Sequence, residues 1–215
     1  MNKEILDKMI TNTFRGFLLL VALIAYFVML FIIEGEKPKK IIEYIVKEQQ
    51  YYSRDDINNV VLNDITGDSQ NDIYTLFDKL TGDRVITFYI VNNSLTYDVP
   101  ISISLAIAMT ENPQFNPDAT NKNNNGSIDV GIFQTNTNTF QDYTVDDLLK
   151  PNINIRCGIW LLAEEKKRYG TWTEAICQYH RGNKIDQKGL KYIDDVLNNE
   201  TAVIKMFNTE YGEIK

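Results

Sequence analysis

The stretch AIAMTENPQFNPDATNKNNNGSIDVGIFQTN, which covers residues 106–136, decides how the rest of the chain is interpreted. Its first part reads as an apolar helix that runs into one carboxylate, Glu111, and Pro113 then ends that helix. A polar loop rich in asparagine follows and leads into a Gly-Ser-x-Asp-x-Gly-x-x-Gln run at residues 126–134. A buried acid beside hydrogen-bonding side chains is the arrangement that cleavage of a glycosidic bond requires.

The helix before Glu111 is predicted to be central and buried, because its residues 102–111, SISLAIAMTE, are apolar on nearly every face. We expect Asp98 to cap its start and Pro100 to occupy its first turn. The helix dipole and the apolar surroundings both favour the neutral form of the Glu111 carboxyl. This predicts a raised pKa, which a general acid needs; a solvent-exposed glutamate at a helix end is the alternative interpretation.

The composition limits the classes of partner and cofactor. Of the 215 residues, 44% are hydrophobic and 24% are charged, which is typical of a globular chain with one domain of ordinary size. A net charge of −7 argues against a nucleic-acid partner, because such proteins carry a basic face. With one histidine, His180, and two cysteines, the chain has few of the usual zinc ligands. We therefore expect no metal site and no cofactor.

An apolar segment near the N-terminus predicts a membrane anchor. Residues 16–33, GFLLLVALIAYFVMLFII, contain no charge, and as a helix they would span about 27 Å, close to the hydrocarbon thickness of a bilayer. A cleaved signal peptide would have a shorter apolar region and a small-residue cleavage site. We predict a short tail at residues 1–15 and one transmembrane helix at 16–33. Three basic residues lie on each side of the helix, so the positive-inside rule does not orient it.

Residues 34–96 are predicted to be a polar, helical lead-in. One helix is indicated by apolar residues at three- and four-residue spacing before Gly82: Ile73, Leu76, Phe77 and Leu80. The next run, residues 84–91, has strand propensity, but we expect a helix because the segments downstream are helical.

Residues 97–215 are predicted to form one mainly α domain. Beyond the segment at 106–136, we expect a helix over about 152–169, a second from Thr171 to Gly182, a third around 190–197 and a separate short helix in the tail from Thr201.

Four sequence blocks between residues 99 and 199 resemble, in order, those of the catalytic domain of bacterial lytic transglycosylases. The blocks are Glu111 with Phe115-Asn116-Pro117, for Glu-Ser-x-Phe-x-Pro; Gly131-Ile132-Phe133-Gln134, for Gly-Leu-Met-Gln; Pro151, Asn154, Ile155 and Gly158, for Pro-x-x-Asn-Ile-x-x-Gly; and Gln178-Tyr179-His180-Arg181-Gly182, for Ala-Tyr-Asn-Ala-Gly. The resemblance implies a lysozyme-like fold. Residues 125–131 are most similar to the branch associated with secretion systems and pili, and also to c-type lysozyme.

The resemblance implies an activity on peptidoglycan. Glu111 would protonate the oxygen between N-acetylmuramic acid and N-acetylglucosamine, and would then accept the proton of the muramoyl C6 hydroxyl as a 1,6-anhydro ring closes. Sugar-binding side chains are expected from Ser127, Gln134, Asn136 and the cleft residue Tyr179. Asn154 and Gly158 are expected to be structural, Asn154 through a cap or loop hydrogen bond and Gly158 through a close helix crossing.

Asp129 leaves the type of reaction open, because it resembles the second carboxylate of c-type lysozyme. If Asp129 faces Glu111 across the cleft, hydrolysis by water becomes an alternative outcome. Otherwise Asp129 hydrogen-bonds the turn backbone and orders the glycine-rich segment. A second alternative is a non-catalytic scaffold that only binds the glycan or a partner in a secretion or flagellar apparatus.

The implied activity also predicts a location and partners. We expect the domain on the periplasmic, extracytoplasmic side of the bacterial cytoplasmic membrane, anchored through residues 16–33. Its expected partners are peptidoglycan glycan strands and a secretion or flagellar apparatus, and a phage origin is open. Cys157 and Cys177 lie on helices expected to be neighbours, so they would form either a disulfide or two buried thiols.

Overall fold

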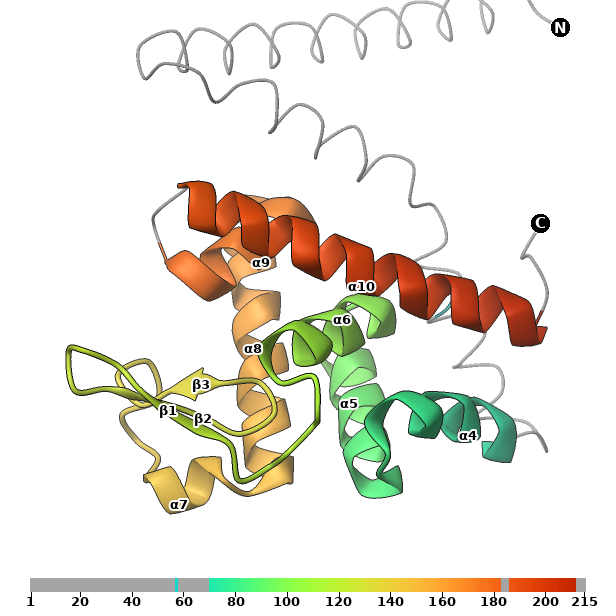
Figure 1. Ribbon diagram of the computed structural model, residues 1–215, viewed down its shortest axis with the longest axis horizontal. Coiled ribbons are helices and arrows are strands. Elements are labelled where there is room, and N and C mark those ends of the chain that lie inside the picture. Colours follow the sequence, from blue (N-terminus) through green and yellow to red (C-terminus); the bar gives the residue numbers. More distant parts are fainter. Residues whose placement is uncertain (1–56, 58–69, 183–185, 212–215) are drawn as a thin grey trace, which may run out of the picture. The chain divides into compact units, whose positions relative to one another are not determined.

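The computed structural model describes Ile57 and residues 70–182 and 186–211 (Figure 1). These residues belong to one compact unit, Tyr51–Lys215. The predicted tail, the membrane anchor at 16–33 and the first part of the lead-in lie outside the described residues, apart from Ile57. No helix in the part of the chain that the structure describes has the length and apolar character needed to cross a membrane.

The described part is mainly helical, as predicted. Its helices are α4 (Gln70–Thr81), α5 (Arg84–Thr96), α6 (Ile101–Glu111), α7 (Val145–Leu148), α8 (Pro151–Tyr169), α9 (Trp172–Arg181) and α10 (Gln187–Tyr211). The two helices expected within residues 73–91 are confirmed as α4 and α5, and the helix expected over about 152–169 as α8.

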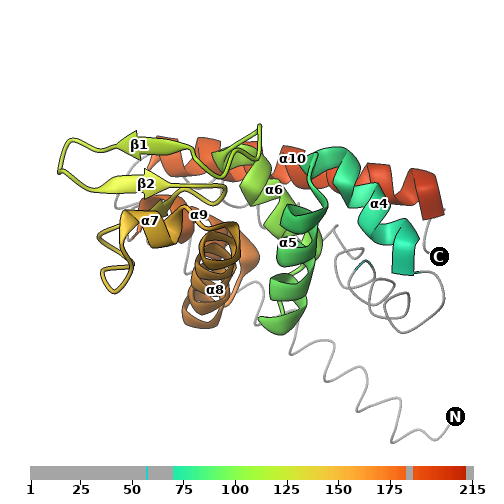
Figure 2. The same ribbon diagram turned by 90° about the horizontal axis from the view of Figure 1, so that it is seen from below.

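Helix α6 is the central element. Residues 101–108 are all buried, as the apolar sequence predicted. The long helix α10 packs along α6, and α5 packs against both α6 and α8 (Figures 1 and 2). This packing fixes the C-terminal end of α6, where Glu111 lies.

The start of α6 differs from the prediction, because Asp98 does not cap it. Pro100 holds the capping position without a side-chain hydrogen bond. Asp98 instead has a positive φ of 56° and ends α5: the Val99 amide donates to the Ser94 carbonyl at 2.9 Å, and the Asp98 amide to the Leu95 carbonyl at 3.5 Å. This is a Schellman arrangement, and aspartate tolerates its left-handed position better than most residues do.

The tail also differs, because α10 runs without a break to Tyr211 and the separate short helix predicted from Thr201 is wrong. The buried stripe of Val196 and Leu197 continues through Val203 and Phe207 at helical spacing. No glycine or proline interrupts the helix after Gly189, so the helix has no reason to end at Thr201.

A small antiparallel sheet was not predicted. Its strands are β1 (Thr120–Lys122), β2 (Ile128–Val130) and β3 (Thr135–Asn136), in the order β1-β2-β3. Asp129 pairs with Asn121 on one side and with Asn136 on the other. A tight turn closes the β1–β2 hairpin, in which the Gly126 amide donates to the Asn123 carbonyl at 3.0 Å. Figure 2 shows this hairpin extending away from the helices.

Candidate active site

Glu111 is the last residue of α6 and contacts α10 through its carboxyl group. The Tyr192 hydroxyl donates a hydrogen bond of 2.6 Å to Glu111 Oε1. Burial raises the pKa of Glu111 from 4.5 to about 7, the hydrogen bond from Tyr192 opposes this rise, and the negative charge of Asp129 adds to it. The raised pKa predicted from the sequence is therefore confirmed, and Glu111 retains its proton for much of the time at neutral pH.

Tyr192 was missed by the sequence reasoning, although it contacts the candidate acid directly. It lies on the buried side of α10, is 6% exposed and stacks on His180, with ring centroids 4.2 Å apart and planes 6° apart. Burial and the charge of Glu111 raise its pKa well above the ordinary value, so the hydroxyl stays a donor. Because 81 positions separate Tyr192 from Glu111, no local pattern could have joined them.

Tyr179, on α9, holds the Gly-Ile-Phe-Gln turn in place. Its hydroxyl donates to the Phe133 carbonyl at 2.6 Å. Burial raises the pKa of Tyr179 well above its ordinary value, and the charges of Glu111 and Asp129 raise it further. Tyr179 therefore lies within the electrostatic field of both candidate carboxylates and remains protonated.

Asn154 fixes the same turn from α8. Its side-chain oxygen accepts from the Phe133 amide at 2.8 Å, and its side-chain nitrogen donates to the Val130 carbonyl at 2.7 Å and to the Thr135 hydroxyl at 2.9 Å. Asn154 is 1% exposed, so these bonds satisfy a buried amide. Asn154 is structural, as expected, and of the two roles left open, a cap or a loop hydrogen bond, the structure shows the loop hydrogen bond.

Two glycines allow this turn to approach α8 closely. A Cβ atom at Gly158 would lie 2.5 Å from the side chain of Phe133, and one at Gly131, where φ is 74°, would lie 2.6 Å from Asn154 Nδ2. The close approach at Gly158 is thus to the Phe133 side chain, rather than to a crossing helix as expected. Both glycines bring the turn close enough to hydrogen-bond with α8 and α9.

Asp129 lies on the middle strand of the sheet. Asn136 Nδ2 donates to Asp129 Oδ1 at 2.6 Å, and Asn123 Nδ2 donates to Asp129 Oδ2 at 2.8 Å. The side-chain amides of Asn123 and Asn136 therefore hold the carboxylate, rather than the backbone of the turn. Since its charge raises the pKa of Glu111, Asp129 lies within electrostatic reach of the candidate acid.

The remaining candidate sugar-binding side chains surround Asp129 and the turn. Ser127 is 3% exposed, donates to Asn125 Oδ1 at 2.8 Å and accepts from Asn136 Nδ2 at 3.0 Å. Gln134 has a φ of 43° and folds its amide back onto the Gly131 carbonyl at 2.7 Å. Hydrogen bonds therefore fix these side chains beside Asp129 and the turn, and their contact with sugar stays a prediction.

Asn112 stands where the family has serine, directly after the candidate acid. Its side-chain nitrogen donates to the Asn116 carbonyl at 2.7 Å and to the Gly131 carbonyl at 3.3 Å, and its oxygen accepts from the Asn116 amide at 3.2 Å. It is 6% exposed. Asn112 thus joins the loop after Glu111 to the turn that Asn154 and Tyr179 hold.

Cys157 and Cys177 are both buried and are not joined by a disulfide. Of the two alternatives considered for this pair, the structure contains the buried thiols. Cys157 packs with Val130, Phe140 and Leu148 in a small apolar cluster.

A mainly helical domain defines a lysozyme-like glycan-cleaving domain when its central helix ends in a half-buried carboxyl of raised pKa, here Glu111, within reach of the charge of Asp129 on a small polar sheet. The family model described as "Transglycosylase SLT domain" matches residues 88–201, more than half of the chain, and the chain belongs to this family. The match begins within α5 and ends within α10.

Known relatives support this membership. Protein IpgF of Shigella flexneri is 35% identical over 108 residues, which cover 46% of this chain and 70% of that protein. Protein IpgF of Shigella sonnei has the same identity and coverage. No solved structure matches the chain. The chain is therefore a peptidoglycan lytic transglycosylase, as its four sequence blocks indicated.

Proposed function

We propose that this transglycosylase cleaves the β-1,4 bond between N-acetylmuramic acid and N-acetylglucosamine with Glu111 as acid and then base. The observation that carries the proposal is the pKa of Glu111, which burial raises to about 7. A carboxyl with that pKa is protonated often enough at neutral pH to give its proton to the glycosidic oxygen, and basic enough, once ionised, to take one back.

The first step breaks the bond between muramoyl C1 and the glycosidic oxygen. The proton of Glu111 moves to that oxygen, which leaves on N-acetylglucosamine with the bonding electron pair. The substrate's own N-acetyl group stabilises the electron-poor C1. Tyr192 stabilises the carboxylate that remains, because its hydrogen bond of 2.6 Å favours the ionised form of Glu111.

The second step closes the anhydro ring. The Glu111 carboxylate takes the proton of the muramoyl C6 hydroxyl, and the C6 oxygen forms a bond to C1. The product is 1,6-anhydro-N-acetylmuramic acid, and Glu111 is again protonated. One carboxyl serves both steps, so a second carboxylate is not required.

Hydrolysis with the help of Asp129 is the second candidate outcome. It is favoured by one observation, that the charge of Asp129 reaches Glu111 and raises its pKa. In that reaction water, rather than the C6 hydroxyl, would attack C1, and the product would carry a free reducing end.

We further propose that residues 16–33 anchor the enzyme in the bacterial cytoplasmic membrane, with the catalytic domain on the periplasmic side. The uncharged apolar sequence of that segment supports the anchor, and a peptidoglycan substrate supports the orientation. A role in local wall opening for an envelope-spanning apparatus is supported by the resemblance of residues 125–131 to the secretion-system and pilus branch. Protease protection in spheroplasts, followed with an antibody to the C-terminus, tests the orientation.

Mass spectrometry of muropeptides tests the reaction. Purified peptidoglycan is digested with the wild-type protein and with Glu111→Gln. We expect anhydro-muropeptides from the wild-type protein and none from the variant. Reducing ends without anhydro-muropeptides would instead establish hydrolysis.

A further inference from the structure

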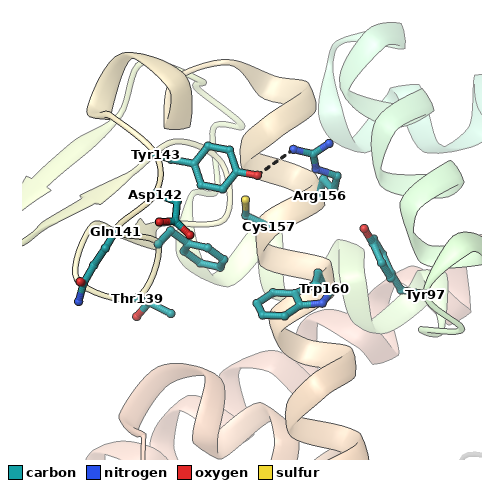
Figure 3. A pocket seen from close by; sticks show the side chains of 9 residues that line it. Tyr97, Thr139, Gln141, Asp142, Tyr143, Arg156, Cys157 and Trp160 are labelled. Carbon is teal, nitrogen blue, oxygen red and sulfur yellow. Dashed lines mark hydrogen bonds between the residues drawn. The ribbon is translucent and has the colours of Figure 1, made fainter.

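A cavity of about 340 Å³ lies between the C-terminal end of α5, the exposed side of α8 and the loop after β3. We call it the α8 cavity. Figure 3 shows the loop side chains on one side, Tyr97 on the other and α8 behind them. Its lining residues are Tyr97, Thr139, Phe140, Gln141, Asp142, Tyr143, Arg156, Cys157 and Trp160.

The α8 cavity and the candidate active site use different faces of α8. Asn154 and Gly158 contact the turn beside Glu111, whereas Arg156, Cys157 and Trp160 line the cavity. At about 100° per residue these two sets point in clearly different directions from the helix axis. None of the lining residues belongs to α6, α9 or α10, which carry Glu111, Tyr179 and Tyr192.

The loop that forms the cavity wall is held in place without a ligand. The amides of Thr139 and Phe140 both donate to the Asn136 carbonyl, at 3.0 and 3.1 Å, and the Tyr143 amide donates to the Phe140 carbonyl at 3.1 Å. Arg156 Nη2 donates to the Tyr143 hydroxyl at 3.2 Å. A ligand would therefore meet a wall that is already ordered, which reduces the entropy lost on binding.

The cavity presents an aromatic surface to solvent. Trp160 is 41% exposed, and in the described part of the chain it is one of three large hydrophobic residues with such exposure. Phe140 supports its ring edge-on, with centroids 6.1 Å apart and planes 64° apart, and Phe140 itself is buried in the small apolar cluster. Phe140 thus holds the Trp160 ring in place, and part of the ring remains exposed to solvent. The apolar C–H face of a pyranose ring fits such a surface, because stacking removes apolar area of both from water.

The polar side chains around Trp160 offer both donors and acceptors. Gln141 and Asp142 are exposed on the wall, and Asp142 forms no hydrogen bond or ion pair with another described residue. The Arg156 side chain, also exposed, hydrogen-bonds only the Tyr143 hydroxyl among the described residues. One carboxylate, one guanidinium and several neutral groups suit a ligand that is uncharged overall and rich in hydroxyl and amide groups.

We infer that the α8 cavity is a second saccharide-binding site, which takes an N-acetylhexosamine unit of a glycan strand. The inference rests on the proposed function for its choice of glycan. A cavity near the lower end of the range of small-molecule pockets, roughly 300–1,000 Å³, has room for one or two sugar rings, not for a long strand. Binding at two places on the wall raises the effective concentration of strands at the Glu111 cleft.

Fluorescence of Trp160 tests the inference directly. The chain has two tryptophans, so the full-length Glu111→Gln, Trp172→Phe protein reports from Trp160 alone and does not cut the ligand. The probe is the trimer of N-acetylglucosamine. We expect a saturable shift of Trp160 emission to shorter wavelength, and an affinity about five- to tenfold weaker after Gln141→Ala or Asp142→Ala, because each removes hydrogen bonds to the sugar.

Co-sedimentation with purified peptidoglycan sacculi gives a second readout. In the Glu111→Gln protein, Trp160→Ala should reduce the bound fraction, and Phe88→Ala should not. Phe88 is the matched control, because it is an aromatic residue with 50% exposure on α5, outside the cavity. Thermal unfolding of each variant checks its folding. If Trp160→Ala is unstable, the sacculus binding of Gln141→Ala and Asp142→Ala, which change other residues of the same cavity, replaces it in the comparison.

Three results would overturn the second site. Trp160 emission could stay unchanged while calorimetry detects binding of the trimer, or it could change with free stem peptides but not with the trimer. The third result is equal sacculus binding by Trp160→Ala and Phe88→Ala. If the wild-type protein releases anhydro-muropeptides and any of these results is obtained, the second site is overturned and the proposed reaction stands. A saturable Trp160 response without anhydro-muropeptides would support the site and overturn the proposed reaction.

Discussion

The Tyr192 hydroxyl donates a 2.6 Å hydrogen bond to Oε1 of Glu111 and so joins α10 to the end of α6. Two opposing effects act on the acid at this contact. Burial raises the pKa of Glu111 and the hydrogen bond lowers it, and the result is a pKa of about 7. Tyr192 therefore limits how strongly burial favours the neutral acid, which matters for an acid that must also act as a carboxylate.

Replacement of Tyr192 by phenylalanine should raise the pKa of Glu111 above 7, because the hydrogen bond that favours the carboxylate is lost. Activity that needs protonated Glu111 falls as pH rises through this pKa. That fall should move to higher pH by about one unit, and the maximal rate should drop about tenfold to a hundredfold. The pH profile of anhydro-muropeptide release measures both effects.

Tyr89→Phe is the control for this variant, because it also removes one tyrosine hydroxyl, but from a half-buried residue on α5 that does not contact Glu111. It should leave the pH profile in place. An unchanged profile in Tyr192→Phe would show that the hydrogen bond does not set the pKa of the catalytic group.

Glu111 should also make the stability of the protein depend on pH. Its folded-state pKa of about 7 exceeds the ordinary 4.5, so between these values the folded protein holds a proton that the unfolded chain has released. This contribution to stability is fully present below pH 4.5 and is lost as pH rises through 7, with a total change on the order of 3 kcal/mol.

Urea unfolding of the wild-type protein and of Glu111→Gln between pH 4.5 and 8 measures this contribution. The free energy of unfolding of the wild-type protein should fall relative to that of the variant as pH rises, since glutamine does not titrate. A difference that stays constant over this range would contradict the raised pKa.

The sequence predicted the elements whose local pattern repeats. The apolar stretch of α6 predicted a buried helix that ends at Glu111, and the periodicity within 73–80 predicted α4. The start of α9 was also predicted at Thr171, where the Thr171 hydroxyl oxygen caps the helix by accepting a hydrogen bond from the Glu174 amide at 3.2 Å. In each case the interaction joins residues a few positions apart.

The features that were missed depend on distant or polar partners. The strands carry residues such as Asn121 and Lys122, which have low strand propensity, and the sheet is reinforced by side-chain amides around Asp129. Tyr192 resembles any aromatic residue on the buried side of a helix until α10 is packed along α6. Asp98 was predicted to cap the start of α6, but it takes the left-handed position that ends α5.

Gly158→Ala should destabilise the domain and impair the site. The added Cβ would lie 2.5 Å from the Phe133 side chain, beginning with its Cβ atom, so the turn must shift. Overpacking of this kind costs about 1–3 kcal/mol of unfolding free energy. Because Tyr179 and Asn154 bond the same turn, activity should fall as well, and both can be measured on one preparation.

A double variant controls for this effect. The double variant Phe133→Ala, Gly158→Ala removes the clash. Its loss of unfolding free energy, relative to the wild-type protein, should therefore be smaller than the sum of the losses in the two single variants. Additive losses would mean that the alanine methyl group does not act through Phe133.

Asp129→Asn separates the two reactions proposed for the site. The variant removes the negative charge that raises the pKa of Glu111, so the loss of activity at high pH should begin at a slightly lower pH. It also loses one of the two acceptors that Asn123 and Asn136 use, which should cost about 1–2 kcal/mol of stability. If Glu111 alone performs acid and base steps, anhydro-muropeptides should still form, at a reduced rate.

The matched control is Asp118→Asn, an exposed carboxylate in the loop before β1, which should change neither the pH profile nor the products. Mass spectrometry of the muropeptides, together with the initial rate, distinguishes the outcomes. Complete loss of product in a folded Asp129→Asn protein would contradict the mechanism with one carboxyl and make Asp129 a second catalytic group. Persistence of the anhydro product would assign Asp129 to the ordering of the sheet and to the electrostatic tuning of Glu111.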